Sequence, residues 1–109
     1  MTVYVDDARI KAKVSSWDTR WSHLFADTPD ELHAFAARLG LRRSWFQDPT
    51  VVGKPRARQG SRAAENWHYD VTDAKRRQAI AIGAVPVSWR DAVDIISARY
   101  EQTKAAADG

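Results

Sequence analysis

Alternation of apolar and polar residues near the N-terminus predicts two strands. Residues 2–5 are β-branched or aromatic, which is typical of a short buried strand. Residues 21–26 predict a second strand, in which Trp21, His23 and Phe25 share one face and the intervening residues share the other. We expect both segments to lie in one sheet.

Three further segments carry weaker strand patterns. Residues 10–14 alternate between apolar residues and lysines, which fits a short edge strand and an irregular loop equally well. Residues 42–46 predict a weak third strand. Residues 85–87 predict a short strand whose Pro86 suits a sheet edge, because proline cannot donate a hydrogen bond to a neighbouring strand.

Capping residues mark the starts of three predicted helices. Thr28 stands before a proline and three residues before a glutamate, which is the pattern of a capping box, and this helix is expected to run to about Leu39. Thr72 begins a second helix that ends near Ile82. Ser88 begins the last helix, again with an acidic residue three positions later.

The order of these elements predicts a small layered α/β fold. We expect a Rossmann-like, mainly parallel sheet of about four strands with about three helices, and 109 residues fit a single domain over 1–109. Residues 48–66 are basic, lack periodicity and are interrupted by glycine and proline, which predicts a mobile loop insertion or a lid. Residues 104–109 are expected to fray.

Composition excludes several classes of site and protein but does not identify a function. Hydrophobic residues make up 44% and charged residues 28%, as in ordinary globular proteins. The absence of cysteine excludes disulfides, thiolate zinc sites and a cysteine nucleophile, and it fits a cytoplasmic location. No apolar run approaches ~18 residues, so we expect no membrane span and no membrane partner. The net charge of +3 permits a polyanionic partner but does not indicate one.

Acidic residues stand where the first two predicted strands end. Asp6 and Asp7 follow the first strand, and Asp27 follows the second. Because ligands of parallel sheets bind beyond the carboxyl ends of the strands, these three carboxylates are candidate ligands for Mg²⁺ or Mn²⁺. The alternative is that they cap turns or are solvated.

The tripeptide at residues 68–70 offers acid–base chemistry. Alternate residues of an extended segment point the same way, so His68 and Asp70 could meet at one ion or one water. We expect His68 to act as acid, base or ligand and Asp70 to orient it, which makes both candidate catalytic residues. Alternatively, Asp70 is a turn residue and His68 packs under Tyr69. His23 and Tyr69 are secondary candidates, and His33 is expected to be structural.

Two groups of cations could bind phosphate. Lys75 and Arg76 lie near the start of the helix at Thr72, where cations oppose the helix dipole unless an anion is bound, although a solvated basic face is the alternative. A second group in the 48–66 loop could contact a nucleic-acid backbone, with Trp45 or Trp67 as a stacking surface. This group consists of Lys54, Arg56, Arg58 and Arg62.

Six motifs stand in order along the chain, namely MTVYVDD at 1–7, WSHL at 21–24, AD at 26–27, ELHAFA at 31–36, HYDV at 68–71 and GAVPV at 83–87. Together they resemble a family of small actinobacterial and phage proteins, domain of unknown function 4031. The resemblance covers about residues 1–97 and implies a compact domain but no activity. It implies that the shared polar residues include Asp6, Asp7, His23, Asp27, His33, His68 and Asp70.

Two functions of different classes follow. The first is a metal-assisted phosphoester-handling protein that acts on a nucleotide or nucleic acid. The second is a non-enzymatic phage or host accessory module that binds nucleic acid or a protein through the basic residues 51–65. A third interpretation makes the Asp and His residues a buried hydrogen-bond network. The chain lacks the Walker, Gly-x-Gly-x-x-Gly, Gly-x-Ser-x-Gly and His-Glu-x-x-His motifs. The sequence leaves open whether the protein is an enzyme.

Overall fold

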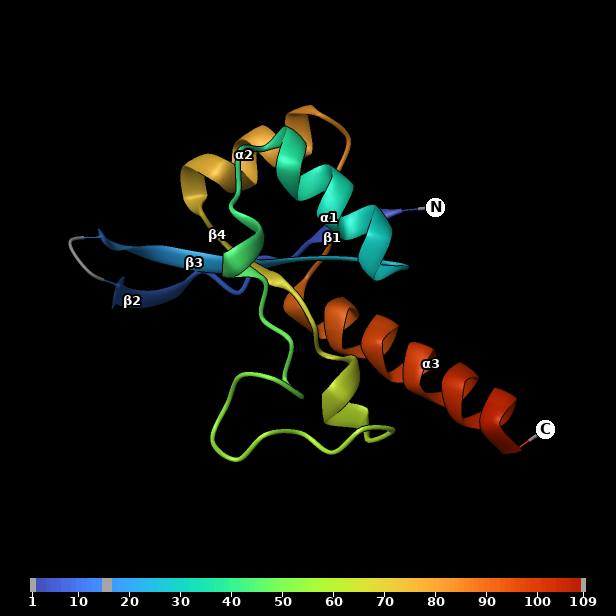
Figure 1. Ribbon diagram of the computed structural model, residues 1–109. Helices are drawn as coiled ribbons and strands as arrows, with labels where there is room; N and C mark the ends of the chain where they lie inside the picture. Colours follow the sequence, from blue (N-terminus) through green and yellow to red (C-terminus); the bar gives the residue numbers. More distant parts are fainter. Residues whose placement is uncertain (1, 15–16, 109) are drawn as a thin grey trace.

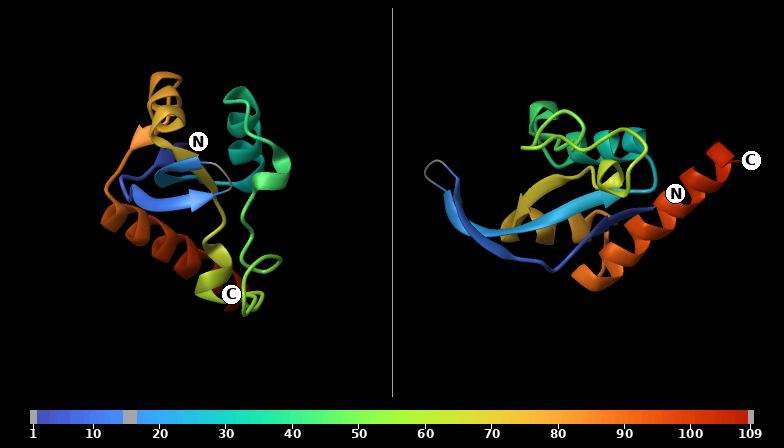
Figure 2. Two further views of the ribbon diagram at one scale, coloured as in Figure 1. Left: turned by 90° about the vertical axis from the view of Figure 1, so that its left-hand side faces the viewer. Right: turned by 90° about the horizontal axis from the view of Figure 1, so that it is seen from below.

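The computed structural model describes residues 2–14 and 17–108, with only the backbone described for 12–14, 17–18 and 107–108. Over these ranges the chain forms three layers, with a central sheet, helices α1 and α2 on one face and helix α3 across the other (Figures 1 and 2). Helices therefore lie over both faces of the sheet.

The longest strand, β3, is the centre of the sheet. It pairs antiparallel with β1 and β2 along one edge and with β4 along the other. The described part of the sheet has one parallel pair, between β1 and β5. The strands are β1 (Val3–Val5), β2 (Ile10–Val14), β3 (Trp17–Ala26), β4 (Tyr69–Thr72) and β5 (Val85–Pro86).

The predicted α/β class with three helices is confirmed over the described residues. The sheet itself has five strands and is mostly antiparallel, so the prediction of a mainly parallel, Rossmann-like sheet of about four strands was wrong. The reason lies in the first connections. β1, β2 and β3 follow one another without a helix between them, whereas a parallel pair needs a crossover of a dozen or more residues. The long connection from β3 to β4 does contain a helix, yet it returns β4 antiparallel to β3.

The three predicted helices are confirmed, together with their capping residues. The hydroxyl of Thr28 accepts a hydrogen bond from the Glu31 backbone N–H at 3.3 Å, although one carboxylate oxygen of Glu31 is buried without a partner. The hydroxyl of Thr72 accepts from the Lys75 N–H at 3.2 Å. The helices are α1 (Pro29–Arg38), α2 (Asp73–Ala81) and α3 (Trp89–Asp108). No helix in the described residues is both long and apolar enough to cross a membrane.

The segment between α1 and β4 differs from its prediction. Arg43–Trp45 is a short 3-10 helix (η1) rather than a strand, and β4 is a true strand where the sequence indicated only an extended segment. The loop between η1 and β4 contains a second 3-10 helix, η2 (Arg62–Glu65), which packs against α3. Residues 104–108 continue α3, and residue 109 lies outside the described residues.

The hydrophobic core lies between the sheet and the α1–α2 layer. Leu24, Tyr69 and Val71 reach it from β3 and β4, and Leu32 meets them from α1. The opposite face of β3 carries Phe25, which is also buried, under α3. The alternation predicted for residues 21–26 is therefore confirmed, because it assigns neighbouring residues to different layers.

Candidate metal site

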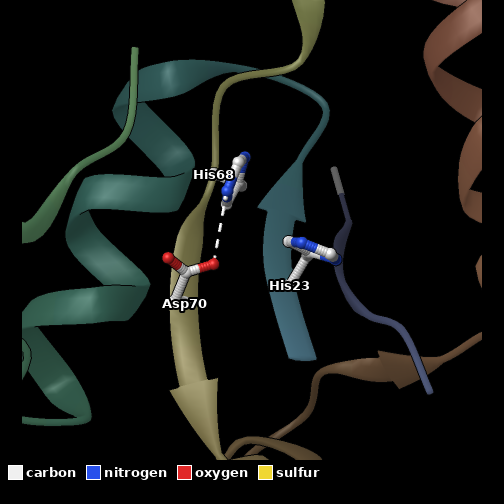
Figure 3. A group of neighbouring side chains, drawn as sticks. All are labelled: His23, His68 and Asp70. Atoms are coloured by element: carbon white, nitrogen blue, oxygen red, sulfur yellow. Dashed lines mark ion pairs between the residues drawn. The ribbon is translucent and has the colours of Figure 1, made fainter. Parts of the chain in front are cut away.

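Strands β3 and β4 bring two histidines and one carboxylate together on the sheet face that α3 covers. His23 of β3 is paired directly with Asp70 of β4, and His68 stands two residues before Asp70. Their side chains project from the two neighbouring strands into one space (Figure 3). One nitrogen from each imidazole and one oxygen of Asp70 lie within 4.8 Å of one another, which is close enough to hold a single metal ion.

Asp6 fixes the orientation of His23. One carboxylate oxygen of Asp6 lies 2.7 Å from His23 Nδ1, and the other accepts the His23 backbone N–H at 2.9 Å. Because an ionised carboxylate only accepts hydrogen bonds, the imidazole donates through Nδ1 and keeps Nε2 for another partner. A histidine whose second nitrogen donates to a carboxylate is the usual arrangement around a protein-bound metal ion.

His68 is held in a similar way by a backbone group. Its Nδ1 lies 2.9 Å from the carbonyl oxygen of Asn66 and donates to it. Its Nε2 lies 3.3 Å from a carboxylate oxygen of Asp70. A metal ion bound to Nε2 in place of a proton would therefore lie beside the Asp70 carboxylate.

The pKa shifts of Asp6, Asp70 and His23 each favour the charged form of the group. Burial opposes ionisation of Asp6, but hydrogen bonds from the His23 side chain and backbone outweigh it and hold the Asp6 pKa below its usual value. Burial also opposes ionisation of Asp70, and contacts with His68 and His23 outweigh it, so the Asp70 pKa is lowered too. The hydrogen bond to Asp6 raises the pKa of His23. Both carboxylates are thus ionised at neutral pH.

A cleft of about 420 Å³ lies over the two imidazoles, between the sheet and the first half of α3. His23, His68 and Phe25 line it from the sheet, and α3 contributes Trp89 and other apolar residues. This volume falls within the range of small-molecule sites. The imidazoles therefore lie where an ion and a small ligand could meet.

The predicted carboxylate cluster at one sheet edge does not form. Asp27 accepts hydrogen bonds from the Thr2 N–H and the Tyr4 hydroxyl, each at 2.9 Å. It therefore lies at the opposite end of β1 from Asp6, because β1 and β3 run antiparallel. Asp7 accepts the N–H of Trp89 at 2.8 Å and caps the start of α3. Of the three carboxylates, the structure brings Asp6 alone to the histidines.

Half of the six predicted phosphate-binding and nucleic-acid-binding cations have structural partners. Lys75 Nζ donates to the Leu39 carbonyl at 2.6 Å, and Arg76 Nε donates to the Asp6 carbonyl at 2.8 Å. Arg62 donates to the hydroxyl of Ser97 on α3. The remaining three, Lys54, Arg56 and Arg58, are exposed.

Tyr69 and His33 lie on the other side of the sheet. The Tyr69 hydroxyl is 2.8 Å from His33 Nδ1, and the Tyr69 ring is buried in the core. Burial, followed by the nearby Arg43 cation, lowers the pKa of His33. The geometry separates this pair from the cluster, although Tyr69 stands between His68 and Asp70 in the chain.

The sequence analysis made His23 a secondary candidate and Asp6 a candidate metal ligand, whereas the structure places His23 opposite Asp70 and Asp6 against the His23 ring. The alternation along residues 21–26 placed His23 on the same face as Phe25, but the pairing of β3 with β4 that sets it opposite Asp70 has no local sequence signal. The contribution of Asn66 comes from its backbone carbonyl, which no side-chain motif could reveal.

Fold and site together define a small mixed α/β protein with two histidines and a carboxylate gathered on one sheet face beside a cleft. Residues 3–99 match the family described as "Protein of unknown function (DUF4031)", and the chain belongs to that family. Neither a curated protein nor a solved structure matches the chain. The resemblance seen in the sequence is confirmed, and the function has to be argued from the site.

Proposed function

We propose that this protein binds a divalent metal ion through His23, His68 and Asp70 and uses it for hydrolytic chemistry. The observation that carries the proposal is the hydrogen bonding of the two imidazole rings. Each is hydrogen bonded through Nδ1 to an oxygen acceptor, Asp6 for one ring and the Asn66 carbonyl for the other. The nitrogens that remain stand beside an ionised carboxylate.

The donor set favours a transition metal ion. Two imidazoles and one carboxylate suit Zn²⁺, Mn²⁺ or Fe²⁺, whereas Mg²⁺ prefers oxygen ligands. Of the two ions that the sequence indicated, Mg²⁺ and Mn²⁺, only Mn²⁺ remains a candidate, and Zn²⁺ is added. Three protein ligands leave a position for water or substrate, where such an ion would act as a Lewis acid.

A phosphoester substrate, expected from the sequence, remains part of the proposal. A metal ion beside the cleft supports it, because such ions polarise phosphoryl oxygens. Lys75 and Arg76 do not support it, since both donate to backbone carbonyls. Hydrolysis of bis(4-nitrophenyl) phosphate by Zn²⁺- or Mn²⁺-loaded protein, lost in His68→Ala, is the corresponding activity assay.

Metal binding is tested by thermal unfolding of EDTA-treated protein after addition of Zn²⁺, Mn²⁺ or Mg²⁺. An ion present at a hundred times its Kd stabilises the native state by about 2.7 kcal/mol. We expect a saturable rise in Tm with Zn²⁺ or Mn²⁺ and one bound ion per chain by elemental analysis. His23→Ala, His68→Ala and Asp70→Ala should each remove the rise.

The chain offers a matched control for these variants. It has three histidines, and His33 lies across the sheet from the cluster, so His33→Ala should keep the full response. Absence of a response to every ion in the wild type would contradict the proposal, and so would a response in His23→Ala and His68→Ala as large as that of the wild type.

A second candidate function is the binding of nucleic acid or a protein through the loop before η2. The specific observation is that Val51 and Val52 are exposed by 59% and 42% close to the exposed cations Lys54, Arg56 and Arg58. Reversal of these three charges to glutamate should abolish binding of a fluorescent single-stranded oligonucleotide at low salt. The same change at Lys11, Arg77 and Lys104, also exposed, is the control.

A further inference from the structure

Large apolar side chains gather at the mouth of the cleft. Ile10, Trp89 and Val93 are exposed by 53%, 52% and 42%, and all three line the cleft. Exposed hydrophobic residues are ordinary when they are scattered, whereas a group around one opening marks a binding surface. The mouth therefore offers a ligand an apolar contact surface on both the sheet side and the α3 side.

The interior of the cleft is also largely apolar. Phe25 lines it from β3 and Ile96 lines it from α3. The carboxylate of Asp6 is turned to His23 and is buried. Among the described residues that line the cleft there is no lysine or arginine. A ligand inside would thus find largely apolar walls, with the ion at the two imidazoles and Asn66 as the polar contacts.

We propose that the ligand of this site is a small organic molecule with an aromatic or aliphatic body and a single oxygen-donor head, such as a carboxylate, a carboxylic ester or a phosphodiester. The head binds the ion at His23 and His68, and the body lies between Phe25 on the sheet and Trp89 on α3. This inference rests on the proposed metal site and names its substrate class. A di- or triphosphate does not fit, because the described lining offers no cationic side chain for the additional charges.

Two metal-binding probes that differ in their apolar part test the inference. Zn²⁺-loaded protein is titrated with benzohydroxamate and with acetohydroxamate, which present the same head with and without a phenyl ring. We expect benzohydroxamate to bind at least about tenfold more tightly, because the phenyl ring buries apolar surface in the cleft. The double variant Trp89→Ala/Val93→Ala should reduce this preference to less than about threefold while its Tm still responds to Zn²⁺.

The control variant replaces a tryptophan and a valine that lie outside the cleft. Trp45 and Val51 are exposed by 48% and 59% and do not line the cleft, so Trp45→Ala/Val51→Ala should keep the preference. Equal binding of the two probes to protein that responds to Zn²⁺, or tighter binding of adenosine diphosphate than of benzohydroxamate, overturns the ligand class and leaves the metal site standing. Absence of a Tm response to both Zn²⁺ and Mn²⁺ overturns both.

Discussion

At the scale of single residues, the candidate site depends on Asp6. Its two carboxylate oxygens accept hydrogen bonds from the ring and the backbone of His23 and from the Ala8 N–H, and Arg76 donates to its backbone carbonyl. The residue is 3% exposed. A buried carboxylate with this many donors holds the imidazole of His23 in one tautomer, so in the proposed metal site Asp6 is a positioning residue for the ligand His23.

Asp6→Asn should weaken Zn²⁺ binding by about 10- to 100-fold, because an amide cannot replace the charged acceptor of the His23 N–H at both oxygens. Isothermal titration with Zn²⁺ measures the change, and circular dichroism confirms that the variant is folded. Asp7→Asn removes the same charge from the start of α3 and should bind Zn²⁺ as the wild type does. Wild-type affinity in Asp6→Asn would contradict the positioning role.

The environment of His33 predicts how the free energy of unfolding depends on pH. Burial lowers its pKa, so the unfolded chain binds more protons than the native protein. His33 therefore contributes stability above the unfolded value of about 6.5, and this contribution is lost as the pH falls through the lower native pKa. In metal-free protein, the free energy of unfolding should fall more in the wild type than in His33→Gln between about pH 7 and pH 5.

Urea denaturation at several pH values measures this difference. The raised pKa of His23 acts in the opposite direction, but it is present in both proteins and cancels. A difference between the wild type and His33→Gln that does not vary with pH would show that His33 is as free to protonate as in the unfolded chain.

At the scale of elements, helix starts were readable from the sequence because the capping interaction is local. Thr28 and Thr72 each accept a hydrogen bond from an N–H three residues ahead, which involves only one turn of chain. Strand direction was not readable. The long segment between β3 and β4 contains α1, η1 and η2, and no local pattern in it states that β4 returns antiparallel.

Thr72→Ala should destabilise the protein by about 1 kcal/mol, because the first turn of α2 loses the acceptor of its Lys75 N–H. Urea denaturation should show a lower midpoint with an unchanged slope. Thr103→Ala is the matched control, since Thr103 is exposed in the middle of the C-terminal half of α3 and should change stability by less than about 0.5 kcal/mol. Equal effects of the two substitutions would exclude a capping role.

At the scale of the whole molecule, Arg99 attaches α3 to the rest of the fold. Its guanidinium donates to the carbonyl oxygens of Ala26 at the end of β3 and Glu65 in η2. It also lies 4.1 Å from the centre of the buried Trp67 ring. Because α3 forms one wall of the cleft, this single side chain helps to set the separation of the two walls.

Arg99→Ala should lower the free energy of unfolding by about 2–3 kcal/mol, because charged hydrogen bonds to two carbonyls and the contact with Trp67 are lost together. Arg99→Lys should recover only part of this loss, since an ammonium group lacks the planar fork that reaches both carbonyls. Urea denaturation measures both variants. The control is Arg90→Ala, whose guanidinium lies over the exposed Trp89 ring. Full recovery by lysine would show that charge alone matters.

The sequence by itself determined the local features of this protein. The alternation of residues 21–26 assigned each side chain to its face of the sheet, and the capping residues located all three helix starts, because these signals arise between residues close in the chain. His68 and Asp70 were identified together for the same reason, since alternate residues of an extended segment share a side.

Tertiary structure alone decided which of these features meet. The antiparallel pairing of β1 with β3 separates Asp27 from Asp6, and the pairing of β3 with β4 sets His23 opposite Asp70. The position of α3 creates the cleft above them. Each of these outcomes depends on contacts between distant parts of the chain, whose free energy comes from burying several elements at once and leaves no pattern within any one of them.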